Sequence, residues 1–168
     1  MPLSMYDASV TVFLHNLNQL SHLLDKGLAH ASATGIDPAT LVGARLAEDM
    51  LPLSAQINIA SDTAKLAAAR LTGIAAPKYE DNETTFAELK ARIAKTREWL
   101  QGLTRESFAA SEERPVSFKA GPTELNFTGQ GYLLHFALPN FFFHVTTAYD
   151  ILRHNGVPIG KRDYLGRA

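Results

Sequence analysis

The sequence predicts an all-α protein, an antiparallel four-helix bundle with a small hairpin or extended insertion before the last helix. Four long segments carry apolar residues at steps of three and four, the period of a helix that buries one face. Connections of medium length separate them, as in helical bundles. The runs 116–119 and 124–127 alternate with a period of two instead. Because no linker or repeat interrupts the chain, we expect residues 1–168 to form a single domain.

The first helix is expected to begin near Ser4, whose hydroxyl can cap it, and to end by Gly35. Its apolar stripe consists of Leu3, Tyr6, Val10, Phe13, Leu17, Leu20 and Leu24. The second long helix is expected from about Asp49 to Leu71, with Gly73 after its end. Together these two segments would supply half of the helical core.

The third helix follows a loop and has a capping-box start, Thr85-Phe86-Ala87-Glu88, with an expected end near Gly102. Gly121-Pro122 separates the two alternating runs and predicts a small hairpin. The last helix should run from about Gly129 to Asn155. Pro139 should kink or split this helix, because it removes a backbone donor and clashes with the preceding turn. We expect the tail, 157–164, to pack across the surface without regular structure.

Composition narrows the possible functions. The formal net charge of -1 gives the chain no electrostatic reason to bind nucleic acid or an anionic membrane. It contains no cysteine, which excludes disulfides, thiolate metal sites and cysteine nucleophiles. We expect a cytoplasmic protein, because the N-terminus does not resemble a signal peptide and no stretch has the roughly 20 apolar residues of a membrane span.

Asn140 and His144 are the strongest candidates for a functional site. They lie four residues apart, which places both side chains on one face of a helix. Gln56 on the second helix can face them. The three side chains can form either a metal site or a buried hydrogen-bond network. Imidazole binds zinc, nickel or copper well, whereas amide oxygens prefer harder ions. His15 and His22 offer an alternative cluster with His144.

Two further features of the sequence bear on partners and charge pairing. Phe141, Phe142 and Phe143 cannot all face one side of a helix, so at least one should reach another surface, such as a dimer interface. Asp62 and Lys65 lie one turn apart and are expected to pair. The first feature predicts a homodimer, and the second a local ion pair.

The sequence resembles an uncharacterised bacterial family grouped with the DinB/YfiT-like metalloenzyme superfamily. The resemblance lies in the run 47–53, in Gln56 and Asp62, and in the block 138–153 with its continuation to Lys161. It implies a four-helix bundle, often dimeric. In that superfamily a histidine on the second helix joins an H-x3-H pair on the fourth to bind a divalent metal, and some members are thiol-dependent transferases or isomerases.

Carried over to this chain, the resemblance places His144 at the second histidine of the pair, Asn140 at the first, and Gln56 at the position on the second helix. Two of the three imidazoles are therefore replaced. We expect an uncharacterised DinB-like protein with a degenerate metal-site pocket that binds a small-molecule ligand. One alternative is a divalent-metal-dependent transferase or hydrolase that uses zinc or nickel on these residues. Another is a structural or interaction homodimer without catalysis.

Overall fold

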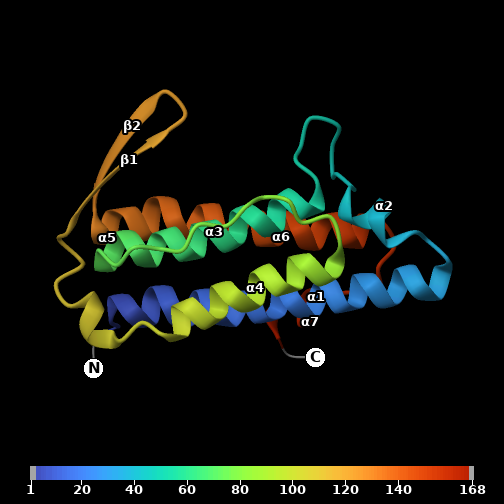
Figure 1. Cartoon of the computed structure of the whole chain (residues 1–168), viewed down its shortest axis with the longest axis horizontal. Helices are drawn as coiled ribbons and strands as arrows, with labels where there is room; N and C mark the ends of the chain where they lie inside the picture. The colour runs from blue at the N-terminus through green and yellow to red at the C-terminus, as the bar shows by residue number, and fades with distance from the viewer. Residues whose placement is uncertain (1–2, 167–168) are drawn as a thin grey trace.

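The computed structural model describes residues 3–166 and is mostly helical, with one two-stranded hairpin (Figure 1). The long helices are α1 (Val12–Thr34), α3 (Leu53–Thr72), α4 (Phe86–Gln101) and α6 (Leu138–His154). The short ones are α2 (Pro38–Val42), α5 (Gly129–Tyr132) and α7 (Lys161–Leu165), and the strands are β1 (Pro115–Ala120) and β2 (Thr123–Thr128). Both the helical class and the hairpin before the last long helix agree with the sequence.

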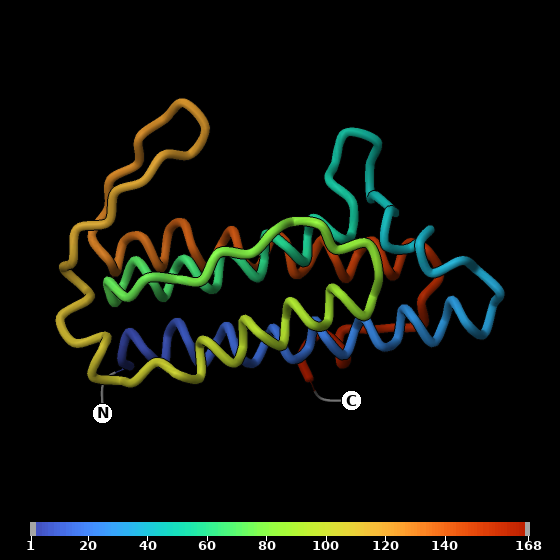
Figure 2. Tube along the Cα trace, in the orientation of Figure 1, coloured from blue at the N-terminus to red at the C-terminus, as the bar shows by residue number. Residues whose placement is uncertain are grey.

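The four long helices lie lengthwise beside one another (Figures 1 and 2). Helix α3 packs against α4 and α6, and α1 packs against the same two helices. Figure 2 shows that α3 and α4 run in the same direction, because the segment 73–85 returns along the length of the molecule between them. A simple up-and-down connection would have reversed the direction at this step, so the return segment is a feature that the periodicity did not reveal.

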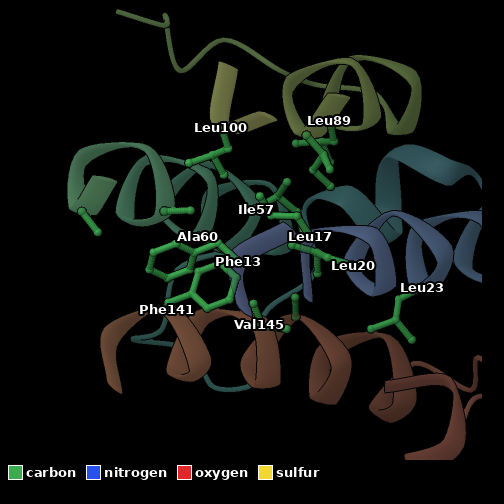
Figure 3. Packing of buried hydrophobic residues seen from close by; sticks show 14 of the residues in the cluster. Phe13, Leu17, Leu20, Leu23, Ile57, Ala60, Leu89, Leu100, Phe141 and Val145 are labelled. Carbon is green, nitrogen blue, oxygen red and sulfur yellow. The ribbon is translucent and has the colours of Figure 1, made fainter. Parts of the chain in front are cut away.

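The core lies between the four long helices, and Figure 3 shows part of it. Phe13, Leu17 and Leu20 of the predicted first stripe are fully buried. The rings of Phe13 and Phe141 meet edge to face, with centroids 4.9 Å apart. This contact joins the first and last long helices at the level where the polar residues described below cross from α3 to α6.

Most of the predicted helix ends are observed. Gly35 and Gly73 follow α1 and α3 with φ of 72° and 79°, the left-handed conformation that favours glycine at this position. Thr85 and Glu88 form both hydrogen bonds of the expected capping box. Helix α3 begins at Leu53 rather than at Asp49, because Pro52 is extended and precedes the first helical residue.

The last long helix continues through Pro139 with a local change of hydrogen bonding. Helix α5 leads into a π-helical turn, Leu133–Ala137, and then directly into α6. The backbone N–H of Leu138 donates to the carbonyl of Leu133, five residues back. Pro139, which has no N–H, stands in the first turn of α6. The expected break is thus a π turn, with helical residues on both sides.

The C-terminal segment corrects another expectation. Residues 161–165 are helical and form α7, which packs on α1. Asp163 accepts a hydrogen bond of 2.8 Å from the N–H of Gly160 and thereby caps this short helix. The expectation of an irregular tail was wrong because a five-residue helix is too short to display a period. Among residues 3–166, no helix has both the length and the apolar character that crossing a membrane requires.

Candidate functional site

Gln56 and His144 meet across the interface of α3 and α6. The His144 Nδ1 atom lies 2.7 Å from the Oε1 atom of Gln56, and the two residues are only 8% and 2% exposed. The Nε2 atom of Gln56 donates to the carbonyl oxygen of Leu51 at 3.0 Å. Since the amide nitrogen is used in this way, the amide oxygen is the acceptor and Nδ1 of His144 carries the hydrogen. The pair is therefore oriented by the backbone that precedes α3.

This hydrogen bond selects the neutral tautomer of His144 that has its lone pair on Nε2. Burial lowers the pKa of His144 below its ordinary value of 6.5, because desolvation penalises the charged ring. The unfolded chain then takes up the proton first as the pH falls. The contribution of this ring to stability is complete above pH 6.5 and decreases as the pH falls from 6.5 toward the lowered pKa.

Asn140 does not join the Gln56–His144 pair. Its Nδ2 atom donates to the Oγ1 atom of Thr63 at 2.8 Å. Thr63 lies seven residues after Gln56, two turns further along the same face of α3. The three residues expected in one site are thus divided between two neighbouring contacts. Thr63 was missed, although its seven-residue spacing from Gln56 could have suggested it.

A third polar contact continues this series along α3. The Nη1 atom of Arg70, seven residues after Thr63, donates to the hydroxyl of Tyr132 at 2.8 Å. Gln56, Thr63 and Arg70 therefore each hydrogen-bond to a side chain between α5 and the middle of α6. Their partners follow in reverse order, as expected for neighbouring helices that run in opposite directions. These contacts fix the register of α3 against the last helix, since a slip of one turn would break all three.

A cavity of about 300 Å³ opens beside the Asn140–Thr63 contact. Helix α3, strand β1, the return segment and the π turn contribute to its walls. One side is aromatic and consists of Phe118, Tyr132 and Phe136. The remaining lining residues are mostly polar or charged: Asn58, Ile59, Asp62, Thr63, Leu66, Arg70, Asp81, Lys119, Ala120 and Asn140. An aromatic wall with a few converging polar groups is the usual composition of a small-molecule site.

Asn58 is the least satisfied polar residue of this cavity. It is 8% exposed, and its Oδ1 atom makes no hydrogen bond with any residue of the described range 3–166. A buried amide without a partner is costly, and such groups are rare in folded proteins. The amide therefore lies just behind the cavity wall, and its oxygen has no contact with the open space.

Arg92 holds the return segment against α3 beside this cavity. Its side chain is 0% exposed, and its Nη2 atom lies 2.9 Å from carboxylate oxygens of both Asp62 and Asp81. Its Nη1 atom donates at 3.0 Å to Glu83 and to the carbonyl of Glu80. The expected pair of Asp62 with Lys65 is present as well, at 2.9 Å. Sequence reasoning did not identify Arg92 as a buried residue.

The alternative histidine cluster is not formed. His22 faces α7, where its Nε2 atom lies 3.3 Å from Asp163, and His15 is exposed. Within residues 3–166, no three His, Cys, Asp or Glu side chains are grouped so that they could hold a metal ion. His15 and His22 share a face of α1, but this face meets the C-terminal helix and not α6.

The three consecutive phenylalanines are divided between core and surface. Phe141 is fully buried, Phe142 is half-buried, and Phe143 is 56% exposed. The ring of Phe143 lies edge-on to the imidazole of His144, with centroids 5.2 Å apart. One phenylalanine therefore reaches a different surface, as the helical period requires. The homodimer remains a prediction.

The donor groups at this position do not suit a transition metal. Gln56 and Asn140 supply amides, which are weak ligands for zinc or nickel. Both amides already hydrogen-bond to protein groups, and Asn140 turns toward Thr63 rather than toward His144. His144 contributes the only imidazole of the three. The arrangement can orient a neutral histidine and fix helix register, and we derive no metal-dependent step from it.

Replacing His144 with alanine is expected to lower the free energy of unfolding by about 1–3 kcal/mol, because the buried oxygen of Gln56 loses its partner. Urea denaturation at pH 7.5 would measure the change. The decrease in stability below pH 6.5 should also become shallower, since the ring with the lowered pKa is gone.

The exposed His15 provides the matched control, and His15→Ala should leave both properties nearly unchanged. Elemental analysis of the untagged protein would test the competing interpretation, in which His144 binds a metal. Stoichiometric zinc or nickel that disappears in the His144→Ala variant would show a metal centre in place of a hydrogen-bonded pair.

Comparison with known proteins supports the resemblance seen in the sequence. The chain is similar to the crystal structure of a DinB family member protein from Shewanella denitrificans, with 42% identity and a TM-score of 0.88. The match covers 96% of this chain and 92% of that one. No match was found among curated proteins. The family described as a domain of unknown function, DUF1993, matches residues 5–165. The chain therefore belongs to the DUF1993 family and is a DinB-like protein.

Proposed function

We propose that this protein is a DinB-like four-helix bundle that binds a small organic molecule without a transition metal on Gln56, Asn140 and His144. The binding site is the cavity between α3, the hairpin and the π turn. The observation that carries the proposal is the cavity itself, with its aromatic wall and its converging polar side chains. Its volume of about 300 Å³ lies at the lower end of the range for ligand sites.

The contacts of the cavity walls favour a preformed site. Phe118 packs edge-on against Tyr132 and Phe136, with ring centroids 5.5 and 4.9 Å apart, which fixes the hairpin against the helices. The hydrogen bonds of Arg70 and Asn140 hold two polar side chains in place. Because these groups are already ordered, binding would cost little conformational entropy.

The metal-dependent transferase or hydrolase is less well supported. That function needs a divalent ion with an open position for water or substrate. Gln56 uses both atoms of its amide on protein contacts, and Asn140 turns its amide nitrogen to Thr63. His144 keeps the lone pair on Nε2, so these three positions offer a metal a single imidazole nitrogen. The cavity, in contrast, combines an aromatic wall with several polar side chains.

Filling the cavity tests the proposal. Ile59→Trp adds bulk to one wall from a half-buried position on α3 and should abolish the binding of small aromatic fragments. In the unmodified protein, NMR titration with a fragment set should shift the backbone amides of Phe118, Tyr132 and Phe136. Leu165→Trp on α7, away from the cavity, is the control and should bind as before. Fragment shifts that survive Ile59→Trp, or that never reach these amides, would refute the site.

A further inference from the structure

The charged groups of the cavity are not equally engaged. Asp62 pairs with Lys65 and Arg92, and Asp81 pairs with Arg92. Neither Arg70 nor Lys119 forms an ion pair within residues 3–166. Both acidic side chains of the cavity therefore already form ion pairs within the protein, whereas the two basic side chains at the hairpin side form none among residues 3–166.

Arg70 is also held in a fixed orientation. Its guanidinium lies over the ring of Phe118, 4.0 Å from the centroid, and its Nη1 atom donates to Tyr132. A guanidinium carries five N–H groups, so donors remain after this single hydrogen bond. A planar, stacked guanidinium with free donors suits bidentate binding of a carboxylate or phosphate.

Lys119 approaches the same cavity from the hairpin. It follows Phe118 on β1 and pairs in register with Glu124 of β2. Its side chain leaves the strand on the face opposite to Phe118, but it is long and exposed, so it can reach a bound ion around the edge of the hairpin. Arg70 is thus the fixed cation of the cavity, and Lys119 is an exposed cation at its rim.

We propose that the ligand is a small organic anion, with a carboxylate or phosphate group on Arg70 and Lys119 and an apolar body against Phe118 and Phe136. This inference rests on the proposed function and adds the chemical class of the ligand. A cation would be disfavoured, because Asp62 and Asp81 already form ion pairs with Lys65 and Arg92, whereas Arg70 and Lys119 form none within residues 3–166.

Matched probes test the charge preference on the full chain. Benzoate and phenyl phosphate are the anions, benzylamine is the cation, and benzyl alcohol is neutral; all four share one aromatic ring. We expect at least one anion to bind roughly tenfold more tightly than benzylamine or benzyl alcohol, the factor that a charge-assisted hydrogen bond provides. Comparing benzoate with phenyl phosphate distinguishes the two kinds of anionic group. The affinities would be measured by NMR titration of the cavity amides.

Two variants locate the anion. Lys119→Gln and Arg70→Gln should each weaken the anion roughly tenfold and leave benzyl alcohol unchanged, because only the charged contact is removed. Lys119 makes no side-chain hydrogen bond or ion pair with any residue from 3 to 166, so its variant remains informative if Arg70→Gln unfolds through the loss of the Tyr132 contact. Lys161→Gln on α7 is the control and should have no effect.

The possible failures can be told apart. Equal binding of anion, cation and neutral probe in the cavity would overturn the anion assignment and leave small-molecule binding intact. Anion binding that is insensitive to Lys119→Gln and Arg70→Gln would also overturn it. If no probe of any charge shifts the cavity amides, the proposed function fails together with this inference.

Discussion

Replacing Arg92 with alanine is expected to lower the free energy of unfolding by about 3 kcal/mol, because its removal leaves the buried carboxylate of Glu83 uncompensated. Glu83 is nearly buried and loses a contact of 3.0 Å, while the more exposed Asp62 and Asp81 are partly rescued by water. The loss should appear in urea denaturation monitored by circular dichroism. Since Arg92 holds the return segment, that segment should also become sensitive to proteases.

The surface pair of Arg105 and Asp7 is the control for this experiment. Arg105 donates to Asp7 at 2.6 and 2.7 Å, but its side chain is largely exposed. Exposed ion pairs contribute little to stability because water and salt screen them. Arg105→Ala should therefore cost much less than Arg92→Ala. Equal losses for the two variants would mean that the buried network does not hold the return segment.

Gly129→Ala is expected to have a comparable or larger effect. A Cβ atom at this position would lie 1.9 Å from the carbonyl oxygen of Ser111, a backbone atom that cannot turn away. The N–H of Gln130 donates to the carbonyl of Glu112 at 2.9 Å, so the two backbone segments are also joined by a hydrogen bond. Separating them should cost about 3 kcal/mol or more, at the upper end for overpacked sites. Thermal or urea unfolding would measure it.

Gly160→Ala tests whether the contact is the cause. An added Cβ at Gly160 meets no atom of the described residues within 4 Å, and Gly160 is extended, so the variant should be nearly as stable as the unmodified protein. A small effect of Gly129→Ala, similar to that of Gly160→Ala, would show that the junction of the 111–112 segment with α5 can yield.

The helical segments could be predicted because their signals are local. The stripe of Phe13, Leu17 and Leu20 has the helical period, and glycines stand where two helices end. Thr85 and Glu88 lie three residues apart, so the capping box is visible in the sequence. The hairpin has its turn residues between two alternating runs. Each of these features depends on neighbours within a few positions.

The features that were missed depend on residues far apart in the chain. Arg92 lies between Leu89 and Ile93, beside an apolar stripe, and a charge in that place predicts either an edge position or a buried ion pair. Its partners come from α3 and from the return segment, whose path no period reveals. The parallel course of α3 and α4 was missed for the same reason.

The candidate site was predicted in part. The four-residue step predicted that Asn140 and His144 lie on one face of the last helix. Gln56 was expected to face them, and it does hydrogen-bond to His144, 88 positions further along the chain. The sequence could not show that Asn140 turns to Thr63, because that choice depends on the register of α3 against α6. Nor could the sequence show the cavity, because one of its walls is a hairpin that tertiary contacts hold against the helices.

The position of the hairpin in the cavity wall affects how the site can evolve. The strands β1 and β2 hydrogen-bond to each other in a sheet of two, so their ladder is independent of the helices. Phe118 is tied to the helices through Tyr132 and Phe136, but the exposed positions 119 and 120 can change while the helical core and its polar crossings stay as they are. Relatives that share this scaffold should be able to diversify what they recognise through two adjacent codons, without the compensating substitutions that a change inside the helical interior would demand.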